Sequence, residues 1–233
     1  MYQPARFVFR ALRPGEEPLL GLRAAADDSA ASVGLAEAIA RGSGTGLSPF
    51  VHTSKLAVVA VYFAECHRSA GPGASTVVRI DLSQFNGQIW DVSTPALCGT
   101  TGLRGESYNF AVKHREIVLQ GYVPPKAIVK VCKTDALVLG RQKCSFDEFL
   151  RGLSRDTLIT IATTMQEVPF RREDLQRFPM ENLENMIMGR DPNGLTAIIE
   201  LLPARPPFGS ASAYSSAAEA EELVALHCVK CDL

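Results

Sequence analysis

The sequence predicts an α+β protein in which strands dominate the first 140 residues and helices the remainder. Short runs of β-branched residues, bounded by glycine and proline, recur as far as Val131. Beyond that point, leucines recur at the three- and four-residue spacing of helices that pack on a core. We therefore expect residues 1–140 to form one part and residues 141–233 a helical annex, with a Pro/Ala/Ser-rich linker near residues 203–218.

The composition is that of a globular protein and gives no sign of a membrane or nucleic-acid partner. The 233 residues are 46% hydrophobic and 21% charged, which suits one large domain or a domain with a small annex. A formal net charge of -1 provides no basic excess for a phosphate backbone. No apolar run approaches the roughly 18 to 20 residues of a membrane-spanning helix, and the N-terminal residues lack the layout of a signal peptide. We expect a cytoplasmic protein, or one exported without a classical signal.

The six cysteines are too sparse for a disulfide scaffold in a chain of this length. Cys228 and Cys231 have zinc-ligand spacing and His227 precedes them, but a tetrahedral site needs a second pair. Cys132 and Cys144 lie too far apart along the chain to supply it. We expect no metal site.

The first elements alternate between strands and helices. We expect strands at residues 5–12, 50–55, 75–82 and 87–92, and helices within residues 24–41 and 56–68. Arg10 lies near the end of the first strand and is either an edge-strand arginine whose head reaches water or an anion-binding arginine that faces a cleft. Thr53 and Ser54 end the second strand, where one of them can also cap the helix that follows.

The stretch from Tyr108 to Val131 carries a carboxylate, Glu116, at the start of an apolar run. A Gly-Tyr-Val-Pro-Pro turn separates this run from a second one at Ala127–Val129, which predicts two paired or consecutive strands. The polar, glycine-rich residues 93–107 before this stretch predict a long loop.

The annex is predicted to consist of short helices. Ser145 and Glu148 form a capping box, and Ser154 and Asp156 open the next helix. The remaining expected elements are a strand at Ala136–Leu139 and helices at residues 171–178, 181–188, 195–202 and 218–228.

Taken in order, the polar residues resemble the ADP-ribosyltransferase superfamily, in its arginine–serine–glutamate branch. That branch carries an arginine on the first strand, a Ser-Thr-Ser element on a later one and a glutamate that closes a mobile loop. This chain has Arg10, His52-Thr53-Ser54 and Glu116 in the same order. The segments SPFVHTSKLAVVAVYFAE and NFAVKHREIVLQGYVPPKAIVKV look like parts of ADP-ribosyltransferase-like domains of unassigned specificity, and the resemblance covers about residues 5–131. It implies a split antiparallel β-sandwich, two small sheets that enclose a cleft for NAD.

The resemblance also implies roles for individual residues. Arg10 would pair with the pyrophosphate of NAD or hold the ribose side of the cleft, because its planar fork suits phosphate. His52, Thr53 and Ser54 would line the nicotinamide pocket and orient the glutamate, with Tyr108 among the residues that bind NAD. Glu116 and Ser54 would be catalytic. Glu116 would accept a hydrogen bond from the ribose 2′-hydroxyl and stabilise the positive charge that develops as nicotinamide leaves.

Two positions depart from the family pattern. His52 replaces the first serine, and His114 stands two residues before Glu116, where arginine-modifying relatives carry glutamate and others carry glutamine. Arginine is therefore not implied as the acceptor. His114 would position a different acceptor, or the enzyme would only hydrolyse NAD, or His114 and Arg115 are ordinary solvated loop residues.

Three functions follow from the sequence. The first is an NAD-dependent ADP-ribosyltransferase or NAD glycohydrolase, a toxin or effector whose macromolecular acceptor is a protein or a nucleic acid, with protein favoured. The second is a catalytically inactive ADP-ribosyltransferase-like module that binds a protein partner. The third is a structural α+β protein in which Arg10 and Glu116 are chance surface charges. The first two require that Arg10, Ser54 and Glu116 line one pocket.

Overall fold

The computed structural model describes residues 5–24, 33–41, 48–68, 75–134 and 144–190. Outside these ranges lie the domain boundary expected near residue 140, the strand at Ala136–Leu139, the helices at residues 195–202 and 218–228, the linker and the Cys228–Cys231 pair. Within the described part of the chain, no helix is long and apolar enough to cross a membrane.

Six strands form one antiparallel sheet, in the order β4-β5-β2-β1-β3-β6. They are β1 (Phe7–Ala11), β2 (Phe50–Ser54), β3 (Thr76–Asp81), β4 (Gln88–Asp91), β5 (Glu116–Gln120) and β6 (Ile128–Lys133). Each of these strands was expected from its apolar, β-branched run. Together with the helices they make the protein α+β.

The two halves of the sheet meet at a narrow join between β1 and β2. A single residue pair, Phe9 with Ser54, connects these strands, whereas five pairs connect β2 to β5 and β1 to β3. Beyond the join, the side chain of Arg10 donates a hydrogen bond to the backbone carbonyl of His52. The strands therefore pair as one sheet that is weakly connected at its centre, next to the residues singled out from the sequence.

The strands β5 and β6 are consecutive in the chain but do not form a hairpin. The strand β5 pairs with β2 and β4, while β6 pairs with β3 at the opposite edge of the sheet. Four of the five residues of β5 are buried, as suits a strand inside the sheet whose two faces are covered. The strand β6 alternates between half-buried and exposed residues, a pattern that suits an edge.

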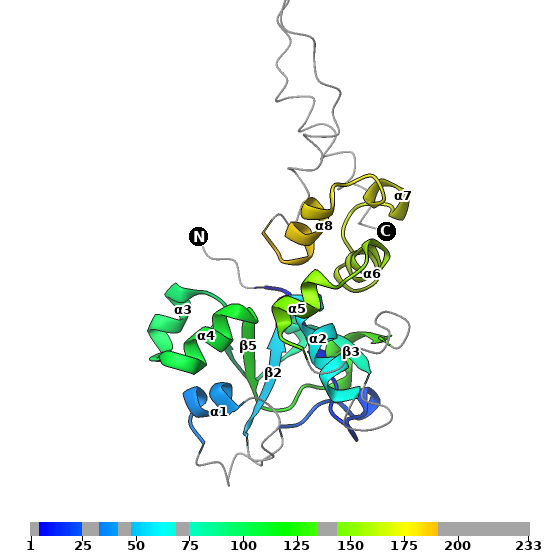
Figure 1. The fold of residues 1–233 in the computed structure, drawn as a ribbon. Helices are drawn as coiled ribbons and strands as arrows, with labels where there is room; N and C mark the ends of the chain where they lie inside the picture. The colour runs from blue at the N-terminus through cyan, green and yellow to red at the C-terminus, as the bar shows by residue number, and fades with distance from the viewer. Residues whose placement is uncertain (1–4, 25–32, 42–47, 69–74, 135–143, 191–233) are drawn as a thin grey trace, which may run out of the picture.

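The helices form two groups on the sheet (Figure 1). The helices α1 (Leu35–Arg41), α3 (Pro95–Thr101) and α4 (Gly105–Lys113) pack against Phe50 and Val118. The second group packs around Phe9 and Ala11 and consists of α2 (Ala57–Arg68), α5 (Phe146–Arg151), α6 (Arg155–Thr160), α7 (Arg172–Leu175) and α8 (Met180–Ile187). A π-helical turn, Ile161–Gln166, continues α6, and short 3-10 turns lie at Pro18–Leu20, Leu82–Gln84 and Pro125–Ala127.

The annex helices share one apolar cluster with α2 and β1. The capping box of Ser145 and Glu148 and the cap at Ser154 are present as predicted. The described part of the annex is therefore packed onto the sheet-bearing part through α2, and Figure 1 shows α5 to α8 gathered beyond that helix.

The long loop predicted at residues 93–107 is wrong, because this stretch contains α3 and the start of α4. Thr94 caps α3 with its side chain, and Pro95 occupies the first helical position. Gly102 adopts a left-handed conformation with φ of 72° and ends α3. The glycine, proline and threonine residues that suggested a loop are the boundaries of two short helices.

Candidate functional site

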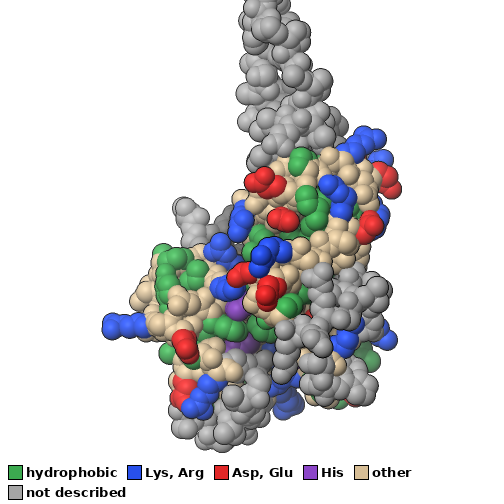
Figure 2. All heavy atoms as spheres, in the orientation of Figure 1, with side chains coloured by type: hydrophobic (Ala, Val, Ile, Leu, Met, Phe, Trp, Pro, Cys, Tyr) green, Lys and Arg blue, Asp and Glu red, His purple; other side chains and the backbone are tan. Residues whose placement is uncertain are grey.

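One cavity of about 70 Å³ lies where β1, β2 and β5 meet α2 and α4. Its lining residues are Phe9, Arg10, Ala11, His52, Thr53, Ser54, Val59, Ala60, Phe63, His67, Phe110, His114 and Glu116. Three of the four histidines of the chain are among them. Figure 2 shows histidine side chains at the centre of the face, beside hydrophobic side chains.

The cavity brings together six of the seven residues predicted to form the site. Arg10, His52, Thr53, Ser54, His114 and Glu116 all line it, so the requirement that Arg10, Ser54 and Glu116 share one pocket is met. Tyr108 does not line it; this residue packs with the apolar cluster of α1, α3 and α4. Arg10 and Glu116 are 4% and 3% exposed, so neither is a chance surface charge.

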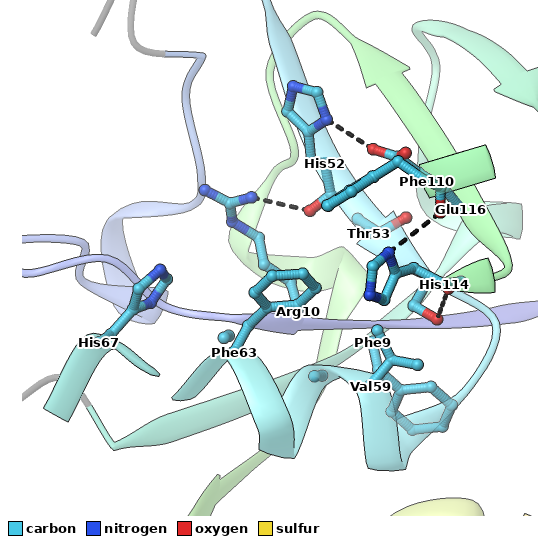
Figure 3. A pocket seen from close by; sticks show the side chains of 13 residues that line it. Phe9, Arg10, His52, Thr53, Val59, Phe63, His67, Phe110, His114 and Glu116 are labelled. Carbon is cyan, nitrogen blue, oxygen red and sulfur yellow. Dashed lines mark hydrogen bonds and ion pairs between the residues drawn. The ribbon is translucent and has the colours of Figure 1, made fainter. Parts of the chain in front are cut away.

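His52 and Glu116 form a short polar contact at the cavity wall (Figure 3), with 2.6 Å between Nδ1 and Oε1. In the register of β2 and β5, Ser54 is opposite Glu116 and His52 opposite Val118, which places the imidazole and the carboxylate diagonally on one face. The second carboxylate oxygen, Oε2, is buried and has no hydrogen-bond partner among the described residues. An unsatisfied buried carboxylate oxygen is costly, so this atom is a candidate ligand-binding group.

The backbone around Glu116 is held on both sides. Arg115 adopts a positive φ of 48°, and its carbonyl accepts a hydrogen bond from the N–H of Lys55. The carbonyl of Glu116 accepts one from the N–H of Val92. Glu116 therefore follows a two-residue turn after α4, and its position is fixed by the strands beside it.

The hydroxyls of Ser54 and Thr53 bind backbone rather than Glu116. Ser54 donates to the carbonyl of His114 at 2.6 Å and accepts from the N–H of Leu56 at 3.0 Å. Thr53 donates to the carbonyl of Ile117 at 2.6 Å. Ser54 thus links the turn before Glu116 to Leu56, the residue before α2. Because the Leu56 N–H lies outside the helix, this contact is not the helix cap expected of one of these two residues.

Arg10 is neutralised by Glu16, a residue the sequence did not single out. The Arg10 Nη2 atom lies 2.7 Å from Glu16 Oε1, which also accepts from Arg13 Nε at 2.8 Å. Burial lowers the pKa of the Arg10 guanidinium, and the charge of Glu16 opposes this effect. Burial works to raise the pKa of Glu16, but the charges and hydrogen bonds of Arg10 and Arg13 hold it below its ordinary value. The edge-strand interpretation of Arg10 is wrong, because β1 is a central strand.

His114 is buried among aromatic rings, so the solvated-loop alternative for it is wrong. Its ring lies 4.2 Å from that of Phe110, measured between centroids, and 5.3 Å from that of Phe63. Burial lowers the pKa of His114 to about 4, and its Nδ1 donates to the Phe110 carbonyl. The ring is therefore neutral at pH 7 and forms an aromatic wall of the cavity.

His67 closes the far end of the cavity (Figure 3) and was missed from the sequence. Its Nδ1 lies 3.2 Å from the carbonyl of Leu12, and burial lowers its pKa. The signal that could have found it is its spacing of four residues after Phe63, which places both side chains on one face of α2. Among the described residues, no group of three or more His, Cys, Asp or Glu side chains could hold a metal ion.

No protein-family model and no curated protein matches the chain. A solved structure described as EcPltA is similar to it, with 18% sequence identity over 55% of this chain and 74% of that chain, and a TM-score of 0.39. A likeness at this level does not assign the chain to a family. The function must be argued from the residues of the cavity.

Proposed function

We propose that the protein is an NAD-dependent ADP-ribosyltransferase, in which the cavity receives the nicotinamide ribose and Glu116 stabilises the reacting carbon. The observation that carries this proposal is that Glu116, which lines the same cavity as Arg10, His52 and Ser54, has a buried Oε2 with no partner among the residues that the structure describes. The narrow join of β1 and β2 beside the cavity supports the finer proposal of a split antiparallel sandwich with an NAD cleft.

In the proposed cleavage of the bond between ribose and nicotinamide, the two oxygens of Glu116 have different roles. Oε1 accepts from His52 Nδ1, which fixes the orientation of the carboxylate. Oε2 is left to accept the hydrogen bond of the ribose 2′-hydroxyl. When the bond between ribose and nicotinamide breaks, its electron pair leaves with the nicotinamide nitrogen and positive charge develops on the ribose. A fixed carboxylate beside that charge lowers the barrier, and one such group contributes on the order of a hundred- to a thousand-fold in rate.

The acceptor we propose is a nucleophile on a protein, with water as the alternative acceptor in an NAD glycohydrolase. The net charge of -1 supplies no general attraction to nucleic acid. His114 faces the cavity as a neutral aromatic ring, so its role toward the acceptor is to shape an apolar wall. The assignment as a toxin or effector rests on the family resemblance alone.

Two observations favour a second function, an inactive ADP-ribosyltransferase-like module that binds a protein partner. The cavity of about 70 Å³ is smaller than the several hundred Å³ of a typical small-molecule site, so a dinucleotide must extend beyond it or displace side chains. The guanidinium of Arg10 is already occupied by Glu16 and the carbonyl of His52. Binding of a phosphate group to Nη2 of Arg10 therefore requires Glu16 to give way, whereas Nε has no partner among the described residues.

Incubation with NAD that is labelled in its adenosine half distinguishes the two functions. Release of nicotinamide, with label on protein, supports the transferase, and release with label only in free ADP-ribose supports the glycohydrolase. The inactive module predicts that neither product appears. Calorimetric titration with NAD in the same buffer then shows whether the cavity still binds the dinucleotide.

A further inference from the structure

Ser48, just before β2, contacts the ring of His52 on the side away from Glu116. Its Oγ lies 3.4 Å from His52 Nε2, while His52 Nδ1 lies 2.6 Å from Glu116 Oε1. Ser48 is 3% exposed and does not line the cavity. Nothing in the sequence pattern marked this serine, because the contact depends on how the chain turns into β2.

One assignment of protons is consistent with the contacts that join Ser48, His52 and Glu116. The Ser48 hydroxyl accepts the backbone N–H of Phe50 at 3.2 Å, which leaves its own hydrogen free to donate. A carboxylate can only accept, so the short contact to Glu116 places a hydrogen on His52 Nδ1. In a neutral ring Nε2 is then an acceptor, and it is the atom that Ser48 faces.

We infer that Ser48 is a positioning residue for Glu116, which acts through His52. The chain Ser48–His52–Glu116 fixes the imidazole at both nitrogens, and the fixed ring holds Oε1 so that Oε2 is presented to the cavity. The hydrogen-bond chain itself does not depend on the reaction, whereas its consequence for catalysis rests on the proposed function.

The order serine, histidine, glutamate is also that of a hydrolase triad, in which the serine is the nucleophile. The burial of Ser48 and its absence from the cavity wall argue against this role. In this hydrogen-bond chain, the cavity-lining residue that carries an oxygen without a partner among the described residues is Glu116, at the opposite end. A reactive serine would require the reverse arrangement, with its hydroxyl facing the substrate.

Proton NMR of the full chain without NAD tests the positioning role independently of any activity. A histidine N–H in a short hydrogen bond to a carboxylate gives a resonance far downfield, visible when it is protected from water. We expect this resonance in the wild type and in Ser48→Thr, which keeps the hydroxyl, and its broadening or loss in Ser48→Ala. The matched control is Ser107→Ala, another buried serine, whose hydroxyl donates to the Arg104 carbonyl within α4. An unchanged resonance in Ser48→Ala would overturn the inference.

A second test of the role of Ser48 measures the rate of nicotinamide release from NAD. Loss of one supporting hydrogen bond predicts a fall in kcat of about 3- to 10-fold in Ser48→Ala, with little change in KM and recovery in Ser48→Thr. Covalent labelling of Ser48 by a fluorophosphonate would contradict the inference, because it would show a nucleophile. If the wild type releases no nicotinamide, the proposed function fails, and the NMR result alone decides whether Ser48 orders His52.

Discussion

The imidazole of His52 and the carboxylate of Glu116 meet across β2 and β5, with 2.6 Å between Nδ1 and Oε1. The contact binds one oxygen of Glu116, and the other is buried without a partner in the part of the chain that the structure describes. Glu116 lines the cavity. His52 thus orients the glutamate through a ring nitrogen. The remaining polar groups of the site mainly hold the backbone that carries these two residues.

Ser54→Ala should destabilise the fold, because the Ser54 hydroxyl joins the turn before Glu116 to the residue before α2. The change leaves the His114 carbonyl and the Leu56 N–H without this partner in a buried region. We expect the free energy of unfolding in urea to fall by about 2 kcal/mol. Ser107→Ala, which removes a hydrogen bond within one helix, should cost less. A loss below about 0.5 kcal/mol in Ser54→Ala would mean that the hydroxyl does not hold the turn.

His114 should make stability depend on pH in the acid range. Its pKa is about 4 in the folded chain and about 6.5 when unfolded, so the unfolded chain binds more protons between these values. The contribution of neutral His114 to the free energy of unfolding is fully present above about pH 6.5. It falls by up to about 3 kcal/mol as the pH decreases toward 4. Other groups also titrate in this window, His67 among them, so the comparison requires a variant.

His114→Phe supplies that comparison, since the ring joins an aromatic cluster and the Phe110 carbonyl keeps its bond from the backbone N–H of residue 114. Urea unfolding of both proteins at several pH values should show a shallower dependence in the variant. Parallel curves for the two proteins would show that His114 is not kept neutral by the fold.

Glu16→Gln should open Arg10 to an anionic ligand. The variant removes the charge that neutralises Arg10 and leaves an amide oxygen that can still accept its hydrogen bond. We expect inorganic pyrophosphate to bind about tenfold more tightly than to the wild type, as measured by calorimetry. Glu17→Gln is the matched control, because this exposed neighbour carries the same charge. Equal affinities in all three proteins would indicate that Arg10 is a purely structural partner of Glu16.

The strands of this protein could be predicted because their apolar, β-branched runs are local signals. The connections between them could not, since the placement of β6 beside β3 rather than β5 depends on pairing between distant segments. The helices α3 and α4 were missed because Pro95, Gly102 and Gly105 occur in loops as often as at helix ends.

The site was predicted as a set of residues but not as a network. The order of Arg10, His52 and Glu116 along the chain pointed to one pocket, and the structure places all three around it. The contacts of Glu16 with Arg10 and of Ser48 with His52 could not be predicted from the sequence, because each depends on how a loop turns back toward a strand. The burial of His114 was also missed, since its aromatic neighbours come from three different helices.

The central claim is that the free oxygen of Glu116 stabilises the ribose as nicotinamide leaves, and Glu116→Gln tests it most directly. The amide has the same size and can still accept from His52, so the fold and the cavity should persist. We measure nicotinamide release from NAD by the wild type, by Glu116→Gln and by Glu106→Gln, an exposed glutamate on α4. We expect release by the wild type and Glu106→Gln, and a rate on the order of a hundred- to a thousand-fold lower in Glu116→Gln. Equal rates in all three proteins, or no release by the wild type, would contradict the central claim.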